Sequence, residues 1–345
     1  MNERLKPSDR GLARTRLLSL LPALALSLTP ANADAASGKC PDTALTGSKW
    51  VTLGTAGGPL PRLNRSQPAN ALVVNGSVYL FDTGDGVLRQ MRAAGLSLGE
   101  VRAVFLTHHH VDHNADLGAV LVTRWVLQHH QPIMIWGPRG TRSMVGKLFE
   151  ANLGTERAPV NPGIATPRLA STATGKDIPP AADGPVIIYR DQNIAVTAVR
   201  NGHYHFDRGS AADRFSRSYS YRIEAPGRVI VFTGDTGPSE KLTKLARGAD
   251  LLVSEVIDLE GVRAMIDTLP QIPTMRREAL MKHIEAGHLT SAAVGRLAQS
   301  AGVRCLVLTH VAPGQDNETN TSVYLDDARA YFSGPVVLAD DLSAF

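Results

Sequence analysis

The sequence predicts an α+β protein in which two β-sheets pack together and helices cover their outer faces. From residue 48 onward, apolar segments of strand length alternate with amphipathic segments that have helical spacing. The strands follow one another in meanders and hairpins as well as alternating with helices, which argues against a simple doubly wound sheet. The 345 residues are 43% hydrophobic and 20% charged, which is the composition of a globular protein with a large core.

The strands and helices are expected in the same style in both halves of the chain. Strands are predicted where short apolar runs occur, at 50–53, 71–74, 78–81, 104–106, 133–136, 186–189, 194–199, 219–223, 229–233, 251–256, 305–309 and 336–339. Helical spacing predicts helices at 86–94, 117–128, 142–151, 239–247, 291–299 and 323–331. Residues 159–184 are rich in Pro, Gly, Ala, Ser and Thr, so we predict a surface loop between the halves.

The first 35 residues have the features of a cleaved secretory signal. A basic stretch precedes the apolar run 17–28, and small residues at Ala33 and Ala35 fit an A-x-A cleavage site. We therefore predict a signal peptide over 1–35, a single domain over 36–345, and a periplasmic or secreted location. No run of eighteen apolar residues occurs, so no transmembrane segment is expected after cleavage.

Charge and cysteine content add little to this picture. The formal net charge is +4, and residues 1–35 hold five basic and three acidic side chains, which leaves a mature chain with nearly balanced charge. Such a surface does not favour a polyanion-binding role. The two cysteines, Cys40 and Cys305, are compatible with a disulfide after export and equally with two unpaired thiols.

The densest group of metal-ligating side chains follows the predicted strand 104–106. Residues 107–113 read THHHVDH. His108 and His110 alternate, so an extended chain points both in the same direction. Asp112 and His113 come where a helix can begin, in a position to face a second ion. Imidazole and carboxylate ligands without cysteine suit zinc and tolerate iron or manganese.

Three further candidate ligands follow three other predicted strands. They are His203, Asp235 and His310. Sites are commonly built from loops at strand ends, so we expect these side chains to join the first group and to supply the ligands that two ions require. His205 lies in the same loop as His203 and is an alternative ligand.

The order H-x-H-x-D-H, then His, Asp and His, resembles that of the metallo-β-lactamase superfamily, and more closely that of its ribonuclease Z and arylsulfatase-like branch. Other segments similar to that branch are 53–59, 79–86, Gln90, Gly137-Pro138, Tyr221-Arg222, Gly234-Asp235-Thr236 and His288-Leu289-Thr290. The resemblance spans residues 51–345. It implies an αββα four-layer sandwich, the metallo-β-lactamase fold, with the site along one edge.

The resemblance also implies a role for each metal ligand. One metal would be held by His108, His110 and His203. The other would be held by Asp112, His113 and His310. Asp235 would bridge the two.

Two further residues gain roles from the resemblance. Asp82 matches an acidic residue that supports the metal loop without binding the metal. His288 matches a proton donor near the leaving group, and we count it with Asp112 as catalytic. Because His288 precedes the predicted helix 291–299, we expect a neutral imidazole there.

These residues predict an exported, zinc-dependent hydrolase. Two cations that share a water can hold it as hydroxide for attack on an ester-type bond. Because Asp235 occupies the bridging position and His288 is present, we favour sulfate or phosphate esters, as in the arylsulfatase-like members. The alternatives are a lactonase or β-lactamase-type hydrolase, a ribonuclease Z-like phosphodiesterase, and a binding protein that keeps only the fold.

The expected substrate is a small molecule, and structured RNA is not expected. Residues 139–184 are of moderate length and not notably basic, and Val111 stands where ribonuclease Z has glycine. The oligomeric state is left open, a homodimer included.

Overall fold

Two β-sheets form the centre of the described part of the chain. The computed structural model describes residue 40 and residues 47–345, except 159–162, 164, 180–183 and 271. The predicted signal peptide, 1–35, lies outside the described residues. None of the described helices has the length and apolar character that a membrane span requires.

The first sheet contains six strands in chain order. They are β1 (Ser48–Gly54), β2 (Ala69–Val74), β3 (Ser77–Thr83), β4 (Val101–Phe105), β5 (Ile133–Gly137) and β6 (Ala173–Asp177). Strands β1 to β3 form an antiparallel meander, and β3 to β6 run parallel to one another.

The second sheet repeats this plan with seven strands. They are β7 (Val186–Arg190), β8 (Ala195–Arg200), β9 (Tyr219–Ala225), β10 (Arg228–Phe232), β11 (Leu251–Ile257), β12 (Leu306–Ala312) and β13 (Val336–Leu338). Strands β7 to β10 are antiparallel, and β10 to β13 are parallel. Each half of the chain is therefore a meander followed by parallel crossover strands, as its mixed pattern predicts.

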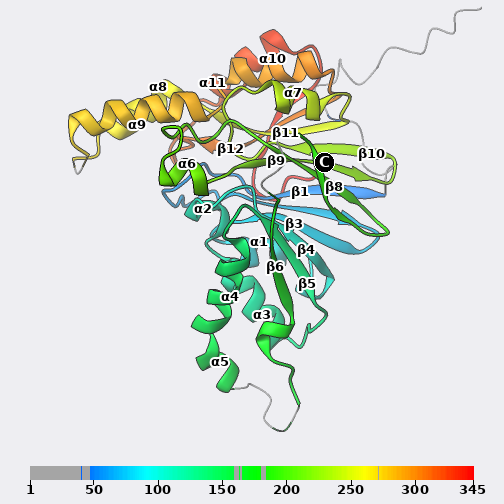
Figure 1. The fold of residues 1–345 in the computed structure, drawn as a ribbon. Coiled ribbons are helices and arrows are strands. Elements are labelled where there is room, and N and C mark those ends of the chain that lie inside the picture. Colours follow the sequence, from blue (N-terminus) through cyan, green and yellow to red (C-terminus); the bar gives the residue numbers. More distant parts are fainter. Residues whose placement is uncertain (1–39, 41–46, 159–162, 164, 180–183, 271) are drawn as a thin grey trace, which may run out of the picture. The chain divides into compact units, whose positions relative to one another are not determined.

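Helices cover the outer face of each sheet (Figure 1). The first sheet packs against α1 (Val87–Ala93), α3 (Leu117–Val126) and α4 (Thr141–Ala151). The second packs against α7 (Glu240–Ala246), α10 (Ser291–Ala301) and α11 (Ser322–Tyr331). The predicted four-layer αββα sandwich is confirmed. The other α-helices described are α2 (Val111–Asn114), α5 (Leu153–Arg157), α6 (Ala211–Phe215), α8 (Leu259–Asp267) and α9 (Thr274–Gly287).

Large aromatic side chains fill the space between the two sheets. Trp50, Phe81 and Phe105 come from the first sheet and Phe232 from the second, and all four are buried. The ring centroids of Phe81 lie 5.1 Å from Trp50 and 5.0 Å from Phe105. Ring contacts of this kind add about 0.5–1.5 kcal/mol per pair to the burial of apolar area. The strands that carry the site are thus attached to a rigid core.

A disulfide joins Cys40 to Cys305, beside this inter-sheet core. Their Cα atoms are 5.4 Å apart. Of the two alternatives that the sequence leaves open, the structure has the disulfide.

Two predictions about secondary structure were wrong. The predicted loop 159–184 contains β6, which pairs in parallel with β5 along the edge of the first sheet. Its sequence, ATGKD, lacks an apolar run because the pairing uses backbone groups alone and one side of the strand has no neighbour. Our predicted helices also omit α8 and α9, which lie on either side of a turn that contains Pro270 and Pro273.

Candidate metal centre

The loop after β4 and the first turn of α2 together carry four of the predicted ligands. Strand β4 ends at Phe105, and α2 begins at Val111 with His110 as its N-cap. His110 has extended backbone angles, so His108 and His110 project to the same side, as their alternation predicts. Asp112 and His113 lie in the first turn of α2, and both are buried.

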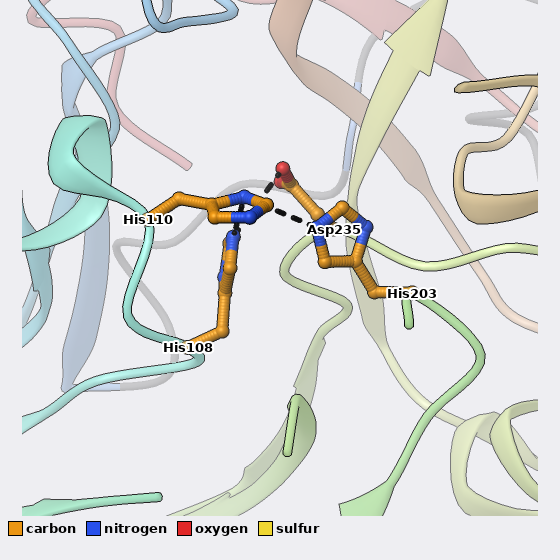
Figure 2. Close-up of side chains that lie close together, drawn as sticks. All are labelled: His108, His110, His203 and Asp235. Atoms are coloured by element: carbon orange, nitrogen blue, oxygen red, sulfur yellow. Dashed lines mark hydrogen bonds and ion pairs between the residues drawn. The ribbon is translucent and has the colours of Figure 1, made fainter. Parts of the chain in front are cut away.

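His108, His110, His203 and Asp235 form the first group of candidate ligands (Figure 2). His110 Nδ1 lies 2.9 Å from His108 Nε2 and 3.2 Å from His203 Nε2. Asp235 Oδ2 is 3.8 Å from His108 Nε2. The ligand atoms of this group all lie within 4.8 Å of one another, so one cation can contact them together.

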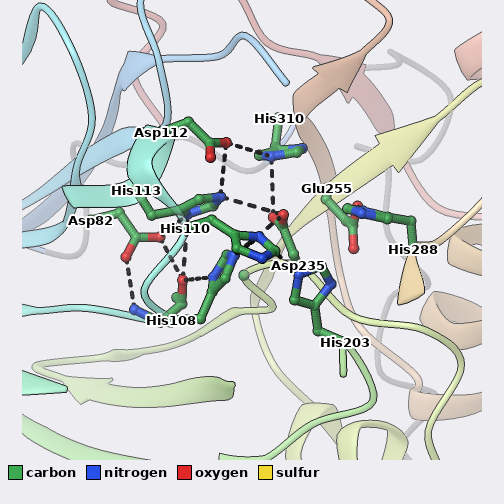
Figure 3. Close-up of polar contacts among 12 residues, drawn as sticks. Asp82, His108, His110, Asp112, His113, His203, Asp235, Glu255, His288 and His310 are labelled. Carbon is green, nitrogen blue, oxygen red and sulfur yellow. Dashed lines mark hydrogen bonds and ion pairs between the residues drawn. The ribbon is translucent and has the colours of Figure 1, made fainter. Parts of the chain in front are cut away.

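Asp112, His113 and His310 form the second group, and Asp235 also contacts it (Figure 3). His113 Nε2 is 3.3 Å from Asp112 Oδ2 and 3.4 Å from Asp235 Oδ2. His310 Nε2 is 3.2 Å from Asp235 Oδ1. Asp235 therefore stands between the two groups, as a bridging ligand must.

Unpaired polar atoms show that the second group fits a cation. Asp235 Oδ1, His113 Nε2 and His310 Nε2 are buried and lie within ion-pair distance of the carboxylates or imidazoles of the group, but none of them makes a hydrogen bond among the described residues. Leaving such atoms unpaired costs about 1–3 kcal/mol each. All three point into the same space, so a shared metal ion would satisfy them together.

The protonation states also fit a metal site. Burial lowers the pKa of His108 and His110, and lowers the pKa of His203 to about 3, so these imidazoles are held in the neutral form that binds metal. Burial raises the pKa of Asp235, but His310 and His113 outweigh it and hold that pKa well below its usual value.

His113 responds in the opposite direction. Burial lowers its pKa, but Asp235, Asp112 and Asp82 outweigh burial and raise the pKa well above its usual value. The carboxylates thus attract positive charge at this point. A divalent cation would supply that charge and release the proton.

Hydrogen bonds outside the ligand groups orient two of the imidazoles. Asp82 accepts from Thr107 N at 2.8 Å and contacts His113 Nδ1 at 2.8 Å, which leaves His113 Nε2 for a metal. His203 Nδ1 donates to the carbonyl of Gly287 at 3.0 Å, which leaves its Nε2 for the first group. Asp82 lies behind the candidate ligands, in contact with His113 and Thr107, which is the kind of supporting position that the resemblance implies.

Asp82 and His310 both lie at β-bulges. Each is skipped in the pairing of its strand with a neighbour, β3 with β2 and β12 with β11. Their φ angles are +59° and +44°, in the left-handed region that side-chain-bearing residues rarely adopt. A bulge re-aims one side chain without ending the strand, which is how β12 turns His310 toward the centre.

His205 does not join the ligand groups. It is exposed, and its Nε2 contacts the carbonyl of Ala286 at 2.9 Å. Of the two histidines in this loop, the structure brings His203 to the site.

His288 pairs with Glu255, a residue that our site prediction lacks (Figure 3). His288 Nδ1 is 2.5 Å from Glu255 Oε2, and Glu255 is buried in β11. Burial lowers the pKa of His288, but Glu255 outweighs it and raises that pKa to about 9. The expected neutral imidazole was wrong, because His288 is controlled by this carboxylate rather than by helix α10. A lone acid within the apolar run LLVSEVI was the available sequence signal.

Comparison with known proteins agrees with this geometry. The family described as "Beta-lactamase superfamily domain" matches residues 78–311. The chain is 31% identical to ribonuclease Z of Mycolicibacterium paratuberculosis, over 85% of this chain and 96% of that protein. Ribonuclease Z of Mycobacterium avium is also 31% identical, with the same coverage.

Solved structures share the fold. Human tRNase Z, short form, has a TM-score of 0.60 at 24% identity and covers 86% of this chain and 98% of its own. The metallo-β-lactamase fold protein YhfI of Bacillus subtilis has a TM-score of 0.59 at 20% identity, with the same coverage. Membership of such a family implies divalent-metal binding, in agreement with the grouped ligands. The chain therefore belongs to the metallo-β-lactamase superfamily of hydrolases, in its ribonuclease Z-like branch.

Proposed function

We propose that this protein is a two-metal phosphodiesterase. The observation that carries the proposal is the meeting of both ligand groups and His288 at one pocket of about 400 Å³. A carboxylate between two imidazole-rich groups suits two zinc ions, with manganese or iron as substitutes.

The proposed ligands of the two ions are the two groups of side chains that lie together in the structure. His108, His110 and His203 hold one ion, and Asp112, His113 and His310 hold the other. Asp235 contacts both groups and would serve both ions. Two bound divalent cations would lower the pKa of a shared water and offset negative charge that develops on the phosphate oxygens.

The His288–Glu255 pair supplies the proton for the leaving group. Glu255 engages Nδ1, so Nε2 is the ring nitrogen that serves the substrate. Glu255 holds the ring in one orientation and stabilises its charged form. A positioned acid of this kind contributes about 10²–10⁴-fold to the rate.

The relatives change the order of our candidate substrates. The sequence alone favours sulfate or phosphate esters of the arylsulfatase-like kind, whereas the curated relatives are named ribonuclease Z. That name supports phosphodiester cleavage, and it counts against our expectation that the substrate is not a structured RNA. We therefore place phosphodiesters first and sulfate esters and lactones behind them.

A substrate panel tests this order. Protein purified, stripped of metal and reconstituted with zinc should hydrolyse bis(4-nitrophenyl) phosphate faster than 4-nitrophenyl sulfate or an aryl lactone. Elemental analysis should find close to two ions per chain. Metal-dependent turnover of the sulfate or the lactone alone would refute the phosphodiesterase proposal in favour of that substrate class. A metal content below half an ion per chain would refute the proposed metal centre.

We also propose export, with residues 36–345 as one mature domain. The basic, apolar and small-residue order of residues 1–35 supports it. The Cys40–Cys305 disulfide supports it too, since disulfides persist mainly in oxidising compartments. N-terminal sequencing should place the mature start between Asp34 and Gly38. A soluble product that keeps Met1 in the cytoplasm would refute export.

A further inference from the structure

The pocket beside the metal-ligating side chains has a polar part and an apolar part. His110, Asp112, Asp235 and His310 line the polar part. The apolar part comes mainly from α8, α9 and the turn between them, which lie side by side and project beyond the second sheet (Figure 1).

One apolar face of helix α9 lines the pocket and ends beside His288. Leu280 and Ile284 line the pocket, eight and four residues before His288, which caps the C-terminal end of α9. Residues four apart lie on one face of a helix. A group bound against Leu280 and Ile284 is therefore next to the imidazole that we assign to the leaving group.

Helix α8 supplies the facing apolar residues. Val262 and Ile266 line the pocket and are each 4% exposed, and Leu269 continues the lining into the turn. Val262 and Ile266 pack with Met281 of α9 in a small core of their own. That core holds the two helices together. The apolar side chains that line the pocket from α8, α9 and the turn between them (Val262, Ile266, Leu269, Leu280 and Ile284) therefore form a fixed surface, which we call the α8–α9 wall.

Few fixed positive charges line this pocket. Arg62 is its one arginine, with no lysine, among the described lining residues. The guanidinium of Arg62 donates to the carbonyl of Pro313 at 2.6 Å. Polynucleotides are held chiefly by lysine and arginine contacts to successive phosphates. A pocket of about 400 Å³ with an apolar wall fits a small ester better.

We infer that the α8–α9 wall binds the leaving group of the substrate, which is a small phosphodiester of an apolar alcohol or phenol. The inference rests on the phosphodiesterase proposed above. Water adds its oxygen to phosphorus, and the phosphorus–oxygen bond to the apolar group breaks. The departing oxygen takes a proton from His288 Nε2, and the proton that the attacking water loses restores His288 through solvent, which leaves an alcohol and a phosphomonoester.

Two diesters that differ only in apolar size test the wall. Methyl phenyl phosphate and methyl 4-tert-butylphenyl phosphate have the same charge and phenols of nearly equal acidity. The second buries more apolar surface, so wild-type kcat/KM should favour it by about tenfold. Leu280→Ala should reduce that preference severalfold. Met275→Ala is the matched control, because Met275 lies on the same helix and is 87% exposed. If Leu280→Ala does not fold, Leu269→Ala in the turn replaces it.

Binding measurements on metal-free protein test the α8–α9 wall independently of the proposed phosphodiesterase activity. Calorimetry should show about tenfold tighter binding of the tert-butylphenyl diester, with a more negative heat-capacity change, and Leu280→Ala should reduce both differences severalfold. Preferential binding without metal-dependent turnover would support the wall and refute the phosphodiesterase. Turnover of both diesters at equal kcat/KM, with equal binding, would refute the wall alone. A larger kcat/KM for a precursor transfer RNA than for either diester would also overturn the inference.

Discussion

Asp235 is the side chain that couples the two ligand groups. Its two oxygens contact imidazoles of both groups, and its backbone is held by Asn201, whose side chain donates to the Asp235 carbonyl at 3.0 Å. We therefore predict that Asp235→Ala lowers metal content by at least one ion per chain. Elemental analysis after gel filtration measures it. Two retained ions together with full activity would show that the bridge is assigned wrongly.

The contribution of His288 to turnover is predicted to be larger for esters with poorer leaving groups. His288→Ala should lower turnover of an unactivated alkyl phosphodiester by about 10²–10⁴-fold, while a nitrophenyl ester, which leaves without a proton, should lose far less. Metal content should not change. Equal losses on both esters would remove the proton-donor role, and lost metal would make His288 a ligand.

Glu255 is predicted to set the pH range in which His288 works. A general acid is active while protonated, so activity falls as pH rises through its pKa. Because Glu255 raises the pKa of His288 toward about 9, Glu255→Gln should move the alkaline limb of the kcat profile to lower pH. The zinc-loaded variant is compared with wild type across pH 6–10 on an alkyl diester. An unmoved alkaline limb would show that the pair is structural only.

At the scale of elements, the segment after β1 must pass very close to α2. A Cβ atom at Gly58 would overlap the carboxylate of Asp112, so glycine is required for Asp112 to face the second group. Gly58→Ala should weaken binding of a metal ion to the second ligand group about 10–100-fold, as changes to groups that hold a metal ligand in place commonly do. Metal titration measures this.

The chain offers a matched control for that substitution. Gly146 lies within α4, and a Cβ there would have no neighbour within 4 Å. Gly146→Ala should leave both metals bound and raise the free energy of unfolding by about 0.5–1 kcal/mol. If Gly58→Ala and Gly146→Ala bind metal equally well, the contact with Asp112 is not what positions the second group.

At the scale of the whole molecule, Asp191 ties the two sheets together. Its carboxylate accepts from Tyr79 of β3 at 2.6 Å and from Tyr189 of β7 at 2.9 Å, besides the backbone N of Asn193 and Ile194. Burial raises the pKa of Asp191, but the hydrogen bond from Tyr79 and the others outweigh it and lower that pKa. A carboxyl with a lowered folded pKa stabilises the fold above its unfolded pKa and loses this effect as pH falls through the folded value.

Asp191→Asn should therefore lower the free energy of unfolding at pH 7 by about 1–2 kcal/mol. The difference from wild type should shrink as the pH falls below about 4. Urea unfolding at both pH values measures it, and comparing the two proteins at each pH removes any common effect of metal loss. A difference that stays constant down to pH 3 would show that the charge on Asp191 is not what stabilises the fold.

The sequence by itself predicted the layers, and it predicted the candidate ligands that the structure brings together. The ligands of residues 108–113 lie within six positions, so local backbone geometry alone directs them to one place. The apolar runs that make strands carry their own periodicity, and all twelve runs predicted as strands became strands. Edge strand β6 did not follow, because pairing through backbone groups needs no apolar side chains.

Only the tertiary structure decided the features that depend on distant contacts. Glu255 and His288 are thirty-three positions apart and meet because β11 and the end of α9 pack at one edge. Cys40 and Cys305 are 265 positions apart and pair across the core. The choice of His203 over His205 and the apolar wall of α8 and α9 also depend on packing between elements. Sequence periodicity reports which face of an element is apolar, but not which other element covers it.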